Sequence, residues 1–93
     1  MFVSGAMNAR ELVAWNVRRL RVGREISAEI LAADADVDRA YVSAIERAVA
    51  NPTIDVLERI ATVLRVEMVE LFATPRPDEE PPKPLRGGRR RNR

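Results

Sequence analysis

The sequence predicts an all-α fold, built as one small domain from five short helices. Apolar residues recur at three- and four-residue spacing along 8–73, and no segment alternates polar and apolar residues for long enough to form a strand. Four of the expected helices also begin at a residue type that caps helix N-termini. The chain has 93 residues, which is room for one hydrophobic core, since domains need roughly 50 to 200 residues.

The first helix is expected over 8–24. Asn8 followed by Glu11 has the pattern of a capping box, in which two side chains bond backbone amides at the start of a helix. Apolar residues then follow at helical spacing: Val13, Val17 and Leu20. We expect these three side chains to face the core.

The second and third helices are expected over 27–34 and 38–47, with Ser27 and Asp38 as their N-caps. Only residues 35–37 separate the two helices. A connection of this length is the geometry of a helix-turn-helix, although an ordinary helical hairpin has the same spacing.

The last two helices are expected over 53–65 and 67–72. Asn51 and Pro52 separate them from the third helix, because proline biases the residue before it away from the α region. Thr53 is the expected cap of the fourth helix.

The charges are divided unevenly between the two ends of the chain. Residues 1–73 carry 9 basic and 11 acidic side chains, whereas residues 74–93 carry 7 basic and 3 acidic ones. The second segment holds five of the six prolines and one large aliphatic residue, so we expect a disordered tail that is Pro-rich and basic. Its end, 86–93, either binds phosphates electrostatically or is an ordinary solvated tail. Residues 1–7 are expected to be a flexible N-terminal segment.

The composition argues against enzymatic chemistry. The chain contains neither Cys nor His, so it offers no disulfide, no thiolate or imidazole metal ligand and no Ser-His or Cys-His pair. We predict no catalytic residue, no metal site and no cofactor, and no small-molecule ligand is evident. No apolar run approaches the roughly 18 residues of a membrane span, so a cytoplasmic protein without membrane contact is expected.

Several motifs together resemble the Xre-type, phage lambda repressor-like helix-turn-helix family over about 15–72. They are Arg-x-x-Arg at 21 and 24, Ser-x-Glu-x-Leu-Ala at 27–32, Tyr-Val-Ser-x-Ile-Glu-Arg at 41–47, Asn-Pro-Thr at 51–53 and the closing Glu-Leu-Phe. The resemblance implies a five-helix lambda repressor-like domain whose third helix enters the major groove of double-stranded DNA. It also implies a homodimer that acts in transcriptional control.

A helical wheel of 38–47 divides the third helix into two sides. At about 100° per residue, Val42, Ile45 and Val49 lie on the inward side. The opposite arc holds Arg39, Ala40, Ser43, Ala44 and Arg47. This arc contains no carboxylate, which suits a helix that must enter a groove bordered by phosphates. Chance patterning on a solvated surface would produce the same arc.

The resemblance assigns DNA-contacting roles by matched position. Base-facing positions are Arg39, Ala40, Ser43 and Ala44, and backbone contacts are Arg47 and Tyr41. An arginine can bond O6 and N7 of guanine, which gives about 1 to 3 kcal/mol of discrimination; alternatively Arg39 is an exposed arginine paired with a nearby carboxylate. Ser27 and Ala28 would present backbone N–H groups to a phosphate, although capping alone explains Ser27. The resemblance also implies a partly buried structural ion pair between Arg21 and Glu46.

The chain departs from the family pattern at several positions. Ala28 replaces the usual glutamine, and three acidic residues, Asp34, Asp36 and Asp38, cluster near the path of the phosphates; both changes should weaken DNA binding. Four residues stand where the family commonly has glycine: Glu25, Asp36, Ala48 and Arg65. Left-handed backbone is often used at such positions, and a non-glycine residue that adopts it costs about 1 kcal/mol or more.

Three classes of function follow from these observations. A sequence-specific, dimeric DNA-binding transcriptional regulator is favoured. A protein-interaction module on the same fold is the alternative, with Met68, Val69 and Phe72 as its apolar surface unless these side chains pack in the core. The third class is an enzyme, for which the chain offers no candidate site, or a nucleic-acid chaperone that binds through its tail without regard to sequence.

Overall fold

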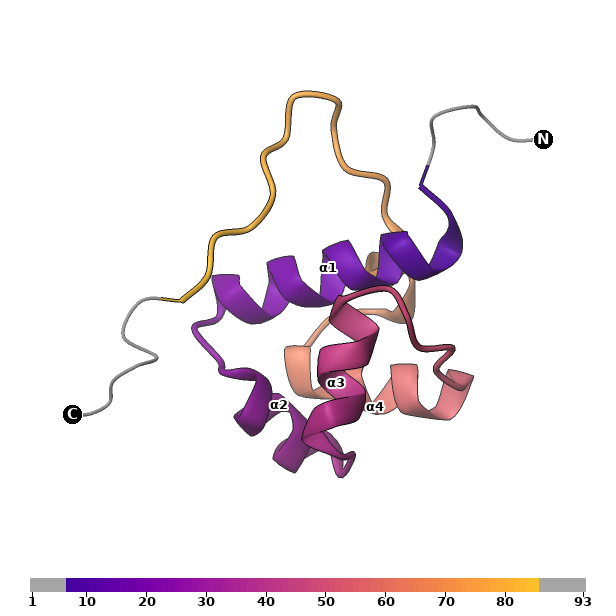
Figure 1. Ribbon diagram of the computed structural model, residues 1–93, viewed down its shortest axis with the longest axis vertical. Helices are drawn as coiled ribbons and strands as arrows, with labels where there is room; N and C mark the ends of the chain where they lie inside the picture. The colour runs from indigo at the N-terminus through magenta and orange to yellow at the C-terminus, as the bar shows by residue number, and fades with distance from the viewer. Residues whose placement is uncertain (1–6, 86–93) are drawn as a thin grey trace.

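The computed structural model describes residues 7–85, which form four α-helices and one short 3-10 helix (Figure 1). The elements are α1 (Ala9–Gly23), α2 (Ala28–Ala35), α3 (Arg39–Glu46), α4 (Ile54–Leu64) and η1 (Met68–Phe72). Within residues 7–85 there is no strand, and the all-α prediction is confirmed for this part of the chain. No helix there is long and apolar enough to cross a membrane.

The fifth element differs from the α-helix expected over 67–72. It is a single 3-10 segment, in which Glu70 N donates to Glu67 O at 2.9 Å across three residues. Five residues are a typical length for a 3-10 segment and give an α-helix little more than one turn. The prediction of an element here was right, and its helix type was wrong.

The tail departs from helical structure after η1. Residues 74–85 contain no helix or strand, and Pro75, Pro82 and Leu85 are half-buried beside the domain. The disorder that we expected from residue 74 therefore stays a prediction. The flexible start and the basic end 86–93 fall largely outside the described residues, which begin at Met7.

The four predicted N-caps are confirmed. Glu11 N donates to Asn8 Oδ1 and Asn8 N donates to Glu11 Oε1, both at 2.9 Å, which completes the capping box. The other three caps accept backbone amides as expected: Ser27 from Ile30, Asp38 from Ala40 and Thr53 from Val56. Local side-chain chemistry thus sets where each α-helix starts.

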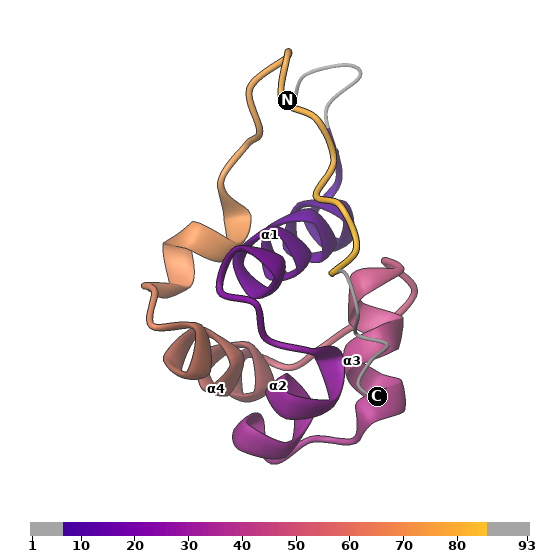
Figure 2. The ribbon, with the colours of Figure 1, turned by 90° about the vertical axis from the view of Figure 1, so that its left-hand side faces the viewer.

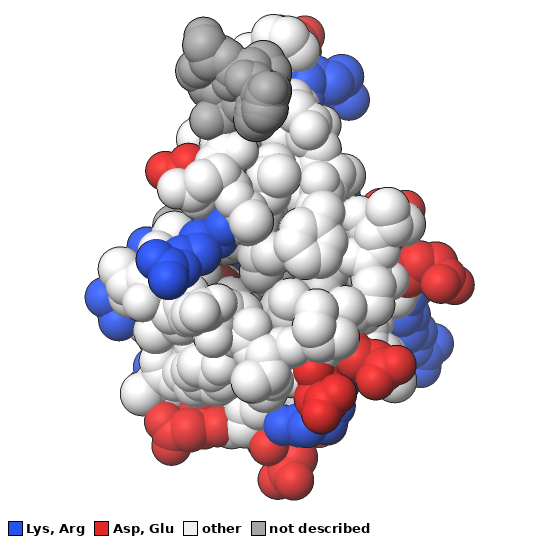
Figure 3. All heavy atoms as spheres, turned by 90° about the vertical axis from the view of Figure 1, so that its right-hand side faces the viewer, with Lys and Arg blue, Asp and Glu red and all other residues white. Residues whose placement is uncertain are grey.

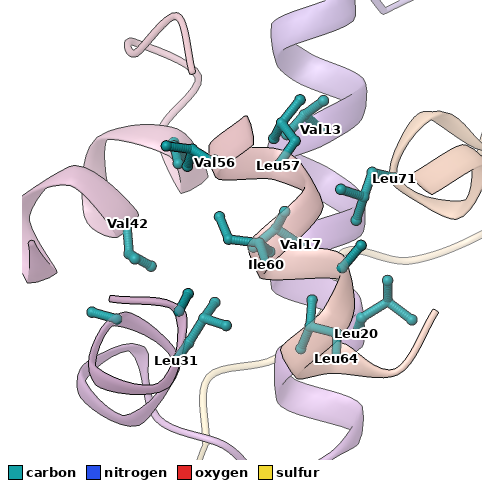
Figure 4. Close-up of a cluster of buried hydrophobic side chains, with 14 residues drawn as sticks. Val13, Val17, Leu20, Leu31, Val42, Val56, Leu57, Ile60, Leu64 and Leu71 are labelled. Carbon is teal, nitrogen blue, oxygen red and sulfur yellow. The ribbon is translucent and has the colours of Figure 1, made fainter. Parts of the chain in front are cut away.

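The core lies where α1, α4 and the α2–α3 pair meet (Figure 4). Its largest fully buried apolar side chains are Val17, Leu31, Val42, Ile45, Ile60, Leu64 and Leu71. Figure 2 shows α3 on one flank of the domain and α4 on the opposite flank, with α1 above them. The packing therefore leaves one side of α3 on the surface.

One core prediction was wrong. Val42 and Ile45 are buried as expected, but Val49 is exposed. The helical wheel no longer applies to Val49, because α3 ends at Glu46 and Ala48 then takes φ 62°.

The four residues that stand at common glycine positions of the family all adopt left-handed backbone. They are Glu25 (φ 57°), Asp36 (φ 58°), Ala48 (φ 62°) and Arg65 (φ 61°). Each follows the end of an α-helix, where such a residue closes the last turn. The strain amounts to about 1 kcal/mol or more per residue, and it allows the chain to change direction within a few residues.

A buried asparagine that the sequence analysis missed fastens the end of the domain to α1. Asn16 is buried on α1, and its Nδ2 donates to Leu71 O at 3.1 Å and to Ala73 O at 2.8 Å. Arg19 Nη2 donates to Asn16 Oδ1 at 3.0 Å. The side chain therefore satisfies carbonyls at the end of η1 that would otherwise lack a partner.

Candidate nucleic-acid interface

The outward side of α3 presents the residues predicted to face DNA. Arg39, Ala40 and Ser43 are exposed on α3 and Ala44 is half-buried, while the inward side packs on α1 and α2. Arg47, just after the helix, is exposed too. The strip therefore consists of small side chains between an arginine at each end.

Arg39 lies near an acidic residue of α2. Its Nε is 3.6 Å from Glu29 Oε2, and the two side chains are 68% and 71% exposed. This contact is longer than a hydrogen bond, and exposed pairs of this kind contribute about 0 to 1 kcal/mol. A guanine contributes more when its O6 and N7 accept both donors of an arginine, about 1 to 3 kcal/mol. Glu29 is thus too weak a partner to hold Arg39 away from DNA.

A hollow of about 400 Å³ lies beside α3. It is lined by Arg18, Ala28, Arg39, Ala40, Ser43, Glu46 and Arg47. Five of the predicted DNA-contacting residues thus meet here. The other three, Ser27, Tyr41 and Ala44, are half-buried and do not line it. Tyr41 packs against the core, and Ser27 Oγ accepts Ile30 N at 3.1 Å as a cap.

Glu46, which lines this hollow, forms an ion pair with Arg21 of α1. Arg21 Nε donates to Glu46 Oε2 at 2.6 Å and Arg21 Nη2 donates to Glu46 Oε1 at 2.9 Å. The side chains are only 11% and 9% exposed, and Arg21 Nη1 also donates to Ile26 O at 2.9 Å. Arg21 thus links α1 to α3 through Glu46 and to the segment before α2 through Ile26. Its bidentate bond occupies both oxygens of Glu46.

Arg18 is a site residue that the sequence analysis missed. It is half-buried on α1 and lines the hollow opposite α3. The available signal was its spacing: Arg18 precedes Arg21 by three residues, and residues three apart lie on the same side of a helix. It meets residues of α3 and of the tail only because long-range packing brings these segments to the same hollows, which the sequence does not specify.

A second surface, at the starts of α1 and α4, is largely apolar and partly hollow, and Arg10 is the charged residue in its lining. Figure 3 shows a side of the molecule whose centre is filled by uncharged residues, with acidic groups towards its edges. A hollow of about 180 Å³ is lined by Ala9, Arg10, Val13, Ile45, Ala50, Asn51, Pro52, Ile54, Leu57 and Phe72. Ile54 is 67% exposed, and Phe72 is partly exposed. We call this set of residues the apolar hollow.

The residues predicted to form an interaction surface around η1 do not lie together on one surface. Leu71 is buried and Met68 packs against the core, whereas Val69 is exposed. Of the three residues proposed for that surface, only Phe72 lines the apolar hollow.

Residues 17–71 match the model of the helix-turn-helix family. The chain belongs to this family. The match includes α2, α3 and the turn between them, and it confirms the resemblance to Xre-type, lambda repressor-like domains. The family consists of DNA-binding transcriptional regulators, which are not enzymes.

Two relatives have names that fit this assignment. The chain is 38% identical over 66 residues to a hypothetical transcription factor of Neisseria meningitidis, over 71% of this chain and 62% of that protein. It therefore spans less than two thirds of that relative. It is 37% identical over 66 residues to the control protein C.BamHI of Bacillus amyloliquefaciens, over 70% of this chain and 82% of that protein.

Solved structures show the same fold. A hypothetical transcription factor from Neisseria, NHTF, superposes with a TM-score of 0.70 at 32% identity, over 81% of this chain and 90% of that one. The restriction-modification controller protein C.AhdI from Aeromonas hydrophila gives a TM-score of 0.66 at 33% identity, over 68% of this chain and 96% of that one.

Proposed function

We propose that this helix-turn-helix protein regulates transcription by inserting α3 into the major groove of a specific DNA sequence. The observation that carries the proposal is the outward strip of α3, which combines small side chains and two exposed arginines with no carboxylate of its own. A helix of these dimensions fits the major groove, which is about 12 Å wide. The names of the relatives, a transcription factor and a control protein, support this function.

Each residue of the strip has a role that its chemistry suits. Arg39 binds the O6 and N7 atoms of a guanine, and Ala40 and Ala44 contact thymine methyl groups. Ser43 lies between them and bonds a base edge. Arg47 and Tyr41 bind the phosphate backbone, and the start of α2 at Ser27 and Ala28 approaches a phosphate through its backbone N–H groups.

We further propose that the protein acts as a homodimer whose subunits meet at the apolar hollow. One small module buries only about 600 to 1,000 Å² on DNA, and paired half-sites add affinity and specificity. The exposed Ile54 beside Phe72 supplies apolar surface for such a contact. The inward side of α3 contributes Ile45 to the apolar hollow, but the outward strip of α3 contributes no residue to it, so a partner at the hollow would leave the strip accessible.

A DNA titration tests the proposal. Binding is measured to the DNA upstream of the protein's own gene and to a random duplex at several salt concentrations. We expect clear preference for the upstream duplex, and we expect Arg39→Ala to lose about 5- to 150-fold of that preference, which corresponds to 1 to 3 kcal/mol. Equal affinity of the unmodified protein for both duplexes contradicts the proposal. If that affinity disappears when the chain is cut after Thr74, the tail is responsible.

A protein-interaction module is the second candidate. The net negative charge of residues 1–73 and the short side chain of Ala28 favour it. Absence of binding to either duplex at low salt, together with an intact fold, would select this candidate.

A further inference from the structure

A continuous groove runs along the junction of α1 and α3. The 400 Å³ hollow beside α3 and a second hollow of about 500 Å³ share three lining residues, Arg18, Glu46 and Arg47. The second hollow extends to Trp15 on α1 and to Pro82 of the tail. We call the two hollows together the Arg18 groove.

The positive charge of the Arg18 groove is not cancelled. Two carboxylates line the groove, against the three arginines Arg18, Arg39 and Arg47. Both oxygens of Glu46 are bonded to Arg21, so that pair is neutral. Glu11 lies in the second hollow, where its Oε1 accepts Asn8 N in the capping box of α1. Within residues 7–85, neither Arg18 nor Arg47 has a carboxylate within ion-pair distance. Arg39 adds a third guanidinium at the end nearest α2.

The groove also contains buried hydrogen-bond donors without acceptors. Among residues 7–85, the two buried side-chain polar atoms that lack a partner are Arg18 Nε and Trp15 Nε1. Both belong to residues that line the groove. Buried donors are nearly always paired in folded proteins, and both exceptions belong to residues of this one cationic groove.

We propose that Arg18 and Arg47 clamp a backbone phosphate of DNA in the Arg18 groove. This inference rests on the proposed function, because it requires that the side of the domain containing α3 faces the duplex. Ala28 presents only a methyl group to the groove and leaves room for the phosphate. Arg18 comes from α1 and is half-buried beside α3, so it binds the strand that passes the helix and not the base edges that the helix reads.

The experiment compares salt dependence among charge-matched variants of the full chain. Arg18→Gln and Arg47→Gln each remove one charge from the groove, and Arg65→Gln removes one from an exposed residue after α4 that does not line it. Each variant is titrated with the random duplex and with the upstream duplex at several salt concentrations. Melting curves establish which variants are folded.

We expect Arg18→Gln to weaken binding to both duplexes by the same factor, about tenfold near physiological salt. It should also lower the slope of log K against log salt by about one, as loss of one phosphate contact does. Arg47→Gln should lower the slope similarly, and Arg65→Gln should leave it unchanged. A folded Arg18→Gln with an unchanged slope, or one that loses only its preference for the upstream duplex, overturns the proposal.

Arg47→Gln keeps the test decisive if Arg18→Gln does not fold. Arg47 is exposed, so its replacement should not disturb the core, and an unchanged slope in this variant overturns the clamp. The random duplex separates the two proposals. An unmodified protein that prefers neither duplex contradicts the proposed function, whereas the slopes on random DNA still test the phosphate contact.

Discussion

The two surfaces of the domain differ in chemistry although they rest on one core. The side of α3 exposes arginines and small side chains beside a cationic groove. The apolar hollow at the starts of α1 and α4 exposes Ile54 and part of Phe72, and Arg10 is the charged residue in its lining. The inward side chains of the same helices hold the fold, so the outward ones are free to differ. The comparison teaches that one surface suits a polyanion and the other an apolar partner, in our account a second copy of the chain.

The largest effect is expected where α3 is joined to α1. Glu46→Ala removes a carboxylate that is 9% exposed and leaves the Arg21 guanidinium, 11% exposed, without its partner. We expect the free energy of unfolding to fall by about 3 to 5 kcal/mol, as for other broken buried pairs. Denaturant melts measure this change. Glu29→Ala is the control, because its pair with Arg39 is exposed and should contribute about 1 kcal/mol or less; equal effects of the two substitutions would contradict the structural role of the buried pair.

The next effect concerns the apolar hollow. Ile54→Glu would place an unpaired carboxylate in the proposed subunit contact, which we expect to weaken self-association by about 2 kcal/mol or more, or at least thirtyfold in Kd. Sedimentation equilibrium measures it. Val69→Glu is the matched control, since Val69 is exposed but does not line the hollow. If Ile54→Glu associates as tightly as the unmodified protein, the dimer does not form through this surface.

A negative charge introduced on the outward strip of α3 should weaken DNA binding without lowering the stability of the fold. Ala40 is exposed, so Ala40→Glu should leave stability nearly unchanged, but its carboxylate would meet phosphates and base acceptors in the groove. We expect a roughly tenfold loss of affinity, about 1.4 kcal/mol, for the upstream duplex. Ala33→Glu, at an exposed position of α2 outside the hollow, is the comparison. Equal losses in the two variants would show that α3 has no special position on DNA.

The smallest effect tests backbone strain next to the strip. Ala48 has φ 62°, a conformation that glycine adopts without the penalty of a Cβ atom. We expect Ala48→Gly to raise the free energy of unfolding by about 1 kcal/mol. The same exchange inside α2, Ala33→Gly, should lower it by a similar amount because glycine is a poor helix former. Thermal melts compare the signs, and a destabilised Ala48→Gly would contradict the assignment of strain.

Local chemistry made much of the fold predictable. The four caps and the four left-handed residues each depend on neighbours within a few positions, and the sequence specifies those neighbours. The contact of Asn16 with Leu71 and Ala73 joins residues more than fifty positions apart. Nothing in the local pattern around Asn16 indicates that partner.

The candidate site, like the fold, was predictable where it depends on local helical spacing and was missed where it depends on long-range packing. The inward and outward residues of α3 follow from helical spacing, which succeeded for Val42 and failed for Val49, where the helix had ended. Arg18 was missed because its role depends on three segments that meet only in the folded chain: α1, the end of α3 and the tail.

The central claim, that Arg39 reads a guanine from the major groove, is tested most directly by removing the atom it binds. In the bound upstream sequence, each guanine is replaced in turn by 7-deazaguanine, which lacks the N7 acceptor. The account predicts at least one guanine whose replacement weakens binding of the unmodified protein about fivefold or more and leaves binding of Arg39→Ala unchanged. If every replacement weakens both proteins equally, Arg39 does not contact a guanine N7 and the account is contradicted.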